Sequence, residues 1–369
     1  MLAERELHPG RRCLRFGMRG LIVVVLLFGG MFGWVVRSAR IQREAVAGIL
    51  TTGRNRVMYN WKWSNGKYIH AGKPWAPARL VDLIGVDYFG HVTHVLLWDP
   101  TDAGFEHAGR LRGLEKLEIG PGLASWSANL ANLAGLTDLT ELDLADSRIT
   151  DAGLIHLRGM TKLSTLIIDS SEVTDAGLAH LSSLTELTKI SIDGSHITVA
   201  GLAHLTRLTK LSKFMLYNGN CISDAGLVHF SGLTELTELS LRDTPVTDAG
   251  LTHLKGLSKL SALSLVGSQV SGTGLAQLNG CSQLSYLALA ISPVTDAGLA
   301  NVKGLTHLDT LHLENTQVSD AGLAHLIGLT NLSLLYVSGT RVTENGAAVL
   351  KRSLPKLETP RLIPISGME

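Results

Sequence analysis

Hydrophobic and polar residues recur along most of the chain in a fixed order. Leucines alternate with polar residues in short stretches such as "LTELSL" (236–241) and "LDTLHL" (308–313). This alternation predicts short strands that each bury one face. A polar turn and a segment such as "DAGLTHLKGL" (248–257) follow each stretch, and leucines at every third position of that segment predict a short helix.

The strand and helix patterns together form one repeating unit. One glycine occupies the same position in each unit, and successive copies of it are 24 residues apart, except for 25 between Gly201 and Gly226. These glycines are Gly153, Gly177, Gly201, Gly226, Gly250, Gly274, Gly298, Gly322 and Gly346. An earlier copy is centred on Gly104, and the degenerate copy "LASWSANLANLAGL" (123–136) fills the gap between them. The chain therefore holds about eleven units.

A period in the twenties that contains L-x-x-L-x-L is the signature of a leucine-rich repeat. One unit cannot bury its apolar face alone, whereas stacked units bury it against one another. We therefore predict an α/β fold in which the repeats form a leucine-rich repeat solenoid, or horseshoe. Its parallel strands line the concave face and its short helices line the convex face. The Ser/Thr-Asp pair before each helix is expected to cap it.

The repeats resemble those of a known group of bacterial proteins. "VTDAGLTHLKGLSKL" (246–260) is similar to the 24-residue "TDAGLxHLxxLxxL" repeats of membrane-anchored, planctomycete-type leucine-rich repeat proteins. The resemblance covers about 95–358 and implies a non-enzymatic binding protein. The repeats also resemble the leucine-rich arms of F-box substrate receptors, but residues 1–94 contain no helical F-box pattern.

The amino-terminal region contains an uncharged run at 20–36 with arginines on both sides. Its 17 residues lie at the short end of the range that spans a bilayer. We predict a single-pass transmembrane anchor here, with a cleaved signal peptide as the alternative. A short Arg-rich tail crosses membranes poorly, so the repeats are expected on the extracytoplasmic side.

Five segments follow from these patterns. They are a basic tail (1–19), the anchor (20–36), a helix with an amino-terminal cap (37–92), the solenoid (93–358) and a carboxyl-terminal tail (359–369). Within the cap, Asn65-Gly66 predicts a hairpin, and "KPWAPARLVDLIG" (73–85) predicts a short helix that ends at Gly85. The aromatic residues of the cap are interpreted as its own core, with a small-ligand site as the alternative.

Charge is distributed unevenly along the chain. Residues 1–94 hold 14 Lys/Arg and 5 Asp/Glu, whereas residues 95–358 hold 18 and 26. An acidic body argues against nucleic acid as a partner, because phosphate contacts need a basic surface. Three cysteines, Cys13, Cys221 and Cys281, match no metal or redox spacing.

A histidine recurs at one position of the repeat and raises the question of a metal site. It occupies His107, His156, His180, His204, His229, His253 and His325. Gln277 and Asn301 replace it in two copies, which favours a polar scaffold role over metal binding. No nucleophile is tied to a histidine and an acid outside the repeat pattern, and phosphate-binding and zinc-protease motifs are missing. We therefore expect no enzyme activity, no metal and no cofactor.

Function is expected where the repeats differ from one another. Strand residues between the leucines should face the concave surface. Their central column is expected to be Asp143, Ile167, Ser191, Met215, Ser240, Ser264, Ala288, His312 and Tyr336. The candidate contacts for a partner are Met215, Tyr217, Arg242, Tyr286, His312, Tyr336, Lys189 and Lys213, which include residue types frequent in binding hot spots. We expect a protein or peptide partner on this face, with a structural, self-associating envelope component as the alternative.

Overall fold

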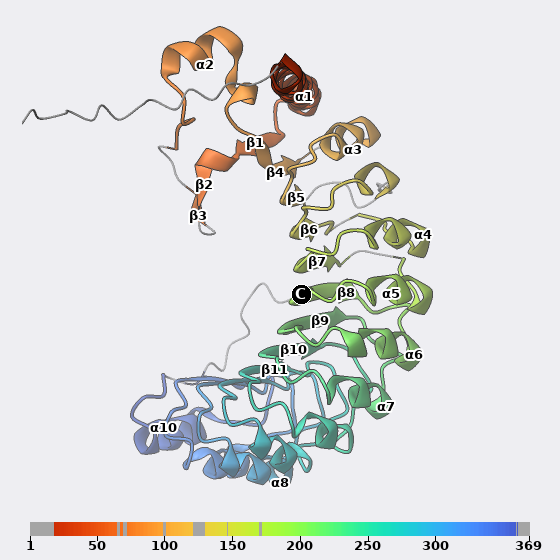
Figure 1. Cartoon of the computed structure of the whole chain (residues 1–369). Coiled ribbons are helices and arrows are strands. Elements are labelled where there is room, and N and C mark those ends of the chain that lie inside the picture. Colours follow the sequence, from red (N-terminus) through yellow and green to blue (C-terminus); the bar gives the residue numbers. More distant parts are fainter. Residues whose placement is uncertain are drawn as a thin grey trace, which may run out of the picture.

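Stacked repeats form a single curved sheet in the computed structural model of the chain, which describes residues 18–64, 67–68, 72–98, 101–120, 130–145, 147–169, 172–358 and 360. The sheet has 12 strands in the order β1-β4-β5-β6-β7-β8-β9-β10-β11-β12-β13-β14, and a separate two-stranded sheet pairs β2 with β3. The strands line the inside of the curve and the helices line its outside (Figure 1). The predicted open solenoid of parallel strands and short helices is confirmed.

Neighbouring strands of the main sheet are parallel, except that β1 runs antiparallel to β4. The strands are β1 (Arg56–Tyr59), β2 (Trp63–Ser64), β3 (Lys67–Tyr68), β4 (Val92–Leu97), β5 (Lys116–Ile119), β6 (Glu141–Asp143), β7 (Thr165–Ile168), β8 (Lys189–Asp193), β9 (Lys213–Tyr217), β10 (Glu238–Leu241), β11 (Ala262–Ser264), β12 (Tyr286–Ala288), β13 (Thr310–His312) and β14 (Leu334–Tyr336).

The helices are mostly single turns. The α-helices are α1 (Met18–Ile49), α2 (Ala78–Ile84), α3 (Asp102–Gly109), α4 (Asp151–Leu154), α5 (Asp175–Leu181), α6 (Val199–Leu202), α7 (Asp224–Leu227), α8 (Asp296–Leu299), α9 (Asp320–Leu323) and α10 (Glu344–Ser353). Most continue as a 3₁₀ turn, and among the repeats that the structure describes in full, two have only 3₁₀ turns, η8 (Gly250–Leu254) and η9 (Leu275–Gly280). The degenerate copy keeps its place in the array through η4 (Leu130–Leu133).

The core is a continuous aliphatic column between the strands and the helices. Leu239 and Leu241 of β10 and Leu251 and Leu254 of η8 are at most 1% exposed, as the alternation predicted. Aromatic rings also lie in this column: Phe105 is fully buried, and Phe214 and Phe230 pack with their centroids 5.1 Å apart.

The carboxyl-terminal part of α1 closes the first repeat. Ala39, Ala45 and Ile49 of this helix are buried. Gly48 lets α3 approach, because a Cβ there would lie 2.3 Å from Nε2 of His107. After a 3₁₀ turn the chain leaves the helix at Gly53, whose positive φ of 70° suits glycine.

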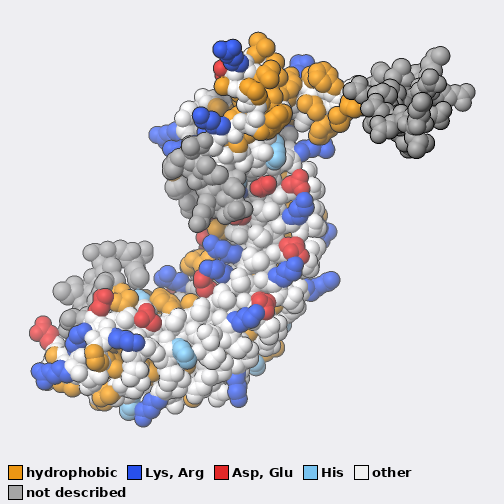
Figure 2. Space-filling view, turned by 60° about the vertical axis from the view of Figure 1, so that its left-hand side comes forward, with side chains coloured by type: hydrophobic (Ala, Val, Ile, Leu, Met, Phe, Trp, Pro, Cys, Tyr) orange, Lys and Arg blue, Asp and Glu red, His pale blue; other side chains and the backbone are white. Residues whose placement is uncertain are grey.

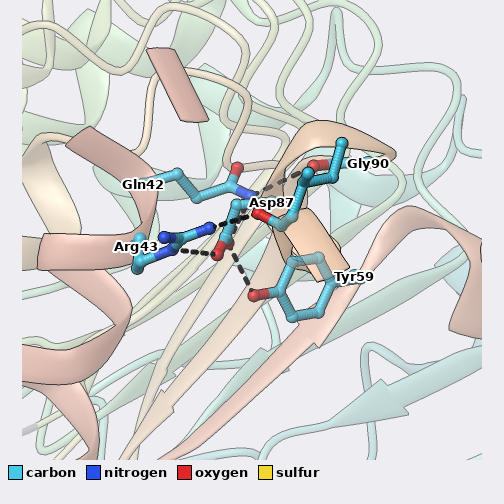
Figure 3. Close-up of polar contacts among 6 residues, drawn as sticks. Gln42, Arg43, Tyr59, Asp87 and Gly90 are labelled. Atoms are coloured by element: carbon cyan, nitrogen blue, oxygen red, sulfur yellow. Dashed lines mark hydrogen bonds and ion pairs between the residues drawn. The ribbon is translucent and has the colours of Figure 1, made fainter. Parts of the chain in front are cut away.

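A buried carboxylate ties α1 to the cap (Figure 3). Asp87 Oδ1 accepts hydrogen bonds from Gln42 Nε2 at 3.0 Å and from the Tyr59 hydroxyl at 2.9 Å. Arg43 Nε lies 3.5 Å from Asp87 Oδ2. Burial, with the Asp87 charge and its hydrogen bond, raises the pKa of Tyr59 well above its ordinary value. The cluster holds α1, β1 and the turn before β4 as one unit.

The predicted transmembrane anchor at 20–36 is wrong. Across the described part of the chain, no helix combines the length and the apolar character that a membrane crossing requires. Among the described side chains, the apolar run of α1 stops at Val36, and Arg37, Arg40 and the docked Arg43 follow it. The single-pass topology, and with it the extracytoplasmic placement of the repeats, is therefore withdrawn.

Hydrophobic side chains nevertheless gather at the α1 end of the molecule (Figure 2). The large exposed ones on this helix include Leu26, Phe28, Met31, Phe32 and Trp34. The basic tail at 1–19 lies outside the described residues except for Met18 and Arg19, and of the carboxyl-terminal tail only Pro360 is described.

The cap elements agree with their sequence patterns. β2 and β3 pair as a hairpin through Trp63 and Tyr68, while Asn65 and Gly66 of its turn lie outside the described residues. α2 begins after Pro77 and ends at Gly85. Trp75 is 81% exposed and packs edge-on against Phe89, so this tryptophan lies at the surface of the cap.

An aspartate ladder, which the sequence patterns did not predict, links the repeats on the convex side. Each repeat aspartate accepts hydrogen bonds from the backbone N–H and the hydroxyl of the Ser or Thr 23 residues later. Asp175, for example, accepts from Thr198 N at 2.8 Å and from Thr198 Oγ1 at 2.5 Å. The other members of the ladder are Asp151, Asp224, Asp248, Asp296 and Asp320. The aspartate was predicted to stabilise the start of its own helix, and it also binds the backbone and the hydroxyl of the next repeat.

The ladder predicts acid-sensitive stability. Burial alone would raise the pKa of Asp248, but hydrogen bonds from Ser271 and the Gly274 N–H outweigh it and lower that pKa. A carboxyl with a lowered folded-state pKa stabilises the fold above its unfolded pKa of about 4, and this stability is lost as pH falls through the folded pKa. The melting temperature of the wild type should therefore drop from pH 6 to pH 3. The melting temperature of the Asp248→Asn variant should drop less steeply over the same range. Parallel curves for the two proteins would contradict this role.

Candidate functional site

The concave face is built from one residue of each strand in register. The expected central column is confirmed, because Ser191 pairs with Met215, Met215 with Ser240, and Ala288 with His312. Tyr336 continues the column from His312. Since neighbouring strands lie about 4.8 Å apart, side chains of adjacent repeats contact each other along this column. The repeats thus present a continuous surface whose chemistry changes from strand to strand.

A first group of candidate residues lies on β8 and β9. Lys189 and Lys213 are in register, and Lys213 Nζ lies 2.5 Å from Glu238 Oε1. The Tyr217 hydroxyl donates to Met215 Sδ at 3.8 Å. We call these residues, Lys189, Lys213, Met215, Tyr217 and Glu238, the Met215 cluster. All five side chains are half-buried, so their polar groups and the Met215 thioether meet solvent on the concave face.

A second group lies on β12 to β14. The His312 ring stacks on Tyr336 with centroids 4.1 Å apart and planes 3° apart, and Tyr286 packs at 5.3 Å from His312. His312 Nδ1 lies 2.9 Å from Glu314 Oε1. Burial and the charge of Glu314 raise the pKa of Tyr286, while the charge of Arg242 opposes this. We call Tyr286, His312, Glu314 and Tyr336 the His312 cluster.

The eight candidate contacts therefore do not form one group. Between Met215 and Ala288 the central column carries the small side chains of Ser240 and Ser264, which separate the two clusters. Arg242 is exposed directly after β10 and lies between the clusters. The repeat pattern did not identify the contact between Glu314 and His312. That contact depends on the χ angles of the two side chains, which the repeat pattern does not encode.

The repeated histidines lie on the convex side, away from both clusters. They belong to the helical segments, as His180 does in α5 and His253 in η8. Within the described residues, no group of three or more His, Cys, Asp or Glu could hold a metal ion. Cys221 and Cys281 are free thiols, exposed and buried respectively. The scaffold interpretation of the histidines stays a prediction.

The comparisons with known proteins agree with the architecture. A leucine-rich repeat family model matches residues 135–157. No curated protein matches the sequence significantly. Among solved structures, an internalin (inlF) from Listeria monocytogenes is similar with a TM-score of 0.50 and 19% identity, over 78% of this chain and 94% of the internalin.

Two further structures are less similar. A leucine-rich repeat protein of Leptospira interrogans has a TM-score of 0.40 and 14% identity, over 69% of this chain and 79% of its own. An internalin C2 from Listeria monocytogenes has a TM-score of 0.39 and 23% identity, over 64% of this chain and 83% of its own. The period, the open parallel sheet and the first of these neighbours therefore show a leucine-rich repeat fold, and the family model matches one of its units.

Proposed function

We propose that this protein is a non-enzymatic interaction module that binds a protein or peptide on the concave face between β8 and β14. One observation carries the proposal: the inward side of this sheet holds two clusters of aromatic, sulfur-containing and charged residues, whereas the buried side is mostly aliphatic. Solenoids commonly use such concave surfaces for binding. The repeat type resembles that of bacterial proteins, and a bacterial origin is part of the proposal.

The chemistry of the face favours a polypeptide over a small molecule. Its polar groups extend over many strands, and the half-buried Tyr217 and Tyr286 can each cover apolar surface while using a hydroxyl. Lys213 and Glu238 already pair with each other. We therefore expect them to determine how the partner is oriented on the face more than how tightly it binds. Tyr286, with its neighbours His312 and Tyr336, offers the larger aromatic area.

Substitution of Tyr217, Arg242 and Tyr286 tests the proposal. We expect the triple variant Tyr217→Ala, Arg242→Glu, Tyr286→Ala to lose its partner in co-purification while its melting temperature stays near that of the wild type. Hot-spot residues typically lower binding by at least about 2 kcal/mol when truncated. Leu239→Ala should do the reverse, because a buried leucine of β10 contributes about 2–5 kcal/mol of stability.

A control variant and a second measurement complete this test. A triple variant in the turns before β8, β9 and β10, Glu186→Ala, Lys210→Glu, Glu235→Ala, changes exposed residues outside both clusters and should bind normally. Binding by the concave variant at wild-type strength would assign the partner to another surface. Sedimentation of the pure protein tests the alternative of self-association, because a self-associating chain would sediment as an oligomer. The exposed apolar side chains of α1 favour this alternative.

A further inference from the structure

The Glu314 carboxylate has an unused acceptor in the concave face. Its Oε1 contacts His312 Nδ1 at 2.9 Å, and the side chain is only 15% exposed. Its Oε2 is buried and has no hydrogen-bond partner among the described residues. A buried carboxylate oxygen without a donor destabilises a fold, so a free donor from outside the chain would be bound favourably. The ladder aspartates differ, since Asp248 Oδ1 and Oδ2 both accept hydrogen bonds.

Aromatic rings surround this carboxylate on the adjacent strands. Tyr286, His312 and Tyr336 form a row in which His312 is stacked on Tyr336. Aromatic faces attract cations, and a carboxylate beside them supplies the opposite charge. Small residues flank Glu314 in the neighbouring repeats, namely Ala290 and Ser338. The combination suits a long side chain that ends in a cation.

A strained residue lies at the edge of the same cluster. Ile291 has a φ of 56°, a conformation that a β-branched residue rarely adopts. The residues with positive φ in neighbouring repeats are Asn218, Asp243, Gly267, Asn315 and Gly339, all of types that tolerate it. The Ile291 side chain is 59% exposed, and its N–H donates to the Glu314 carbonyl at 2.8 Å. Strain combined with an exposed apolar side chain is typical of a contact residue.

We infer that the His312 cluster binds a cationic side chain, arginine or lysine, from a partner polypeptide whose neighbouring apolar residue packs on Ile291. The inference rests on the proposed function, because it names the anchor point of that binding face. The cation pairs with the Glu314 carboxylate through the part of this side chain that is exposed, and it lies against the rings of Tyr286 and Tyr336. The charge of Arg242, which follows β10, acts on Tyr286. The cation of the partner would therefore be added to this basic residue.

Selection of random heptapeptides displayed on phage against the full chain tests the inference. We expect the selected peptides to carry Arg or Lys at one position beside an apolar residue. For a synthetic selected peptide, Glu314→Gln should weaken binding about tenfold or more, and replacing the peptide arginine by citrulline should weaken it equally. The two changes combined should add little further, because they remove the same contact.

Ile291→Gly separates binding from stability. Glycine relieves the positive φ, so the melting temperature should rise, while the peptide affinity should fall about threefold through the lost apolar contact. Glu235→Gln is the matched control, because this exposed carboxylate pairs with Lys259 outside the concave face. It should leave peptide binding unchanged.

Four results would overturn the inference. Selected peptides without a cationic preference, whose binding still needs Tyr217 and Arg242, would reject the cation site and keep the proposed function. Peptides that bind Glu314→Gln as tightly as the wild type would reject the role of this carboxylate. A gain of peptide affinity in Arg361→Gln would assign the site to the chain's own carboxyl-terminal arginine. A face that selects no peptide and binds no partner would reject the proposed function as well.

Discussion

Phe214→Ala is expected to lower the free energy of unfolding by about 3–5 kcal/mol, the range for a large aromatic side chain removed from a core. Phe214 is fully buried on β9, in register with Ile190 and Leu239, and its ring packs on Phe230. The adjacent strands carry the smaller Ile190 and Leu239 at this position, so these two side chains are too small to fill the space that the ring leaves. Urea unfolding followed by circular dichroism measures the effect.

Phe214→Leu is the matched control, because leucine is the usual residue at this position of the repeat. It retains most of the apolar volume and should destabilise by less than about 1.5 kcal/mol. Hydrogen exchange should show the loss of protection near β8 to β10 first, since each repeat contacts only its neighbours. A loss below about 1 kcal/mol in Phe214→Ala would mean that the array relaxes around the missing ring.

The second large effect is expected from Gly201→Ala. A Cβ at this position would lie 2.1 Å from Asp175 Oδ1, which is far inside van der Waals contact. The Asp175 carboxylate would have to move and release Thr198. Two hydrogen bonds to a charged group, at about 1.5–3 kcal/mol each, outweigh the gain of up to about 1 kcal/mol in helix propensity. We expect a net loss of about 2–4 kcal/mol.

Two comparisons identify the cause of that loss. Gly153 has the same place in its repeat, but among the described residues a Cβ there would meet nothing closer than Leu130 Cδ1 at 3.4 Å, so Gly153→Ala should be nearly neutral. In an Asp175→Ala background the clash is absent, and Gly201→Ala should cost little more. Equal losses for Gly153→Ala and Gly201→Ala, measured by thermal unfolding, would refute the clash as the cause.

The repeating part of the fold could be predicted from the sequence because each unit shows the same pattern. The period placed Leu239 and Leu251 in the core and aligned the column from Asp143 to Tyr336, as the register confirms. The cap helix that ends at Gly85 carried ordinary start and stop signals. Periodicity is informative here because stacking forces the same environment on every copy.

Features that depend on contacts between distant residues could not be predicted. Hydropathy alone assigned 20–36 to a membrane, whereas the docking of Gln42 and Arg43 on the cap requires residues more than 40 positions away. The strain at Ile291 and the unpaired oxygen of Glu314 arise from backbone and side-chain geometry that no repeat pattern encodes. The candidate contacts stay predictions, since their role depends on an unidentified partner.

The aspartate ladder has a consequence for how the array bends. It is interrupted where Val199 and Gly272 take the position of the aspartate, so among the described residues no carboxylate of the preceding repeat binds the repeats that begin at Asp224 and Asp296. The interruptions divide the array into blocks of three repeats, 151–223, 224–295 and 296 onward, and the pattern DAGL, DAGL, xxGL or xxGA recurs in each. We expect these two seams to act as hinges. The second seam lies between the repeats that carry Tyr286 and His312, so flexing there would adjust the opening of the His312 cluster to the polypeptide that it binds.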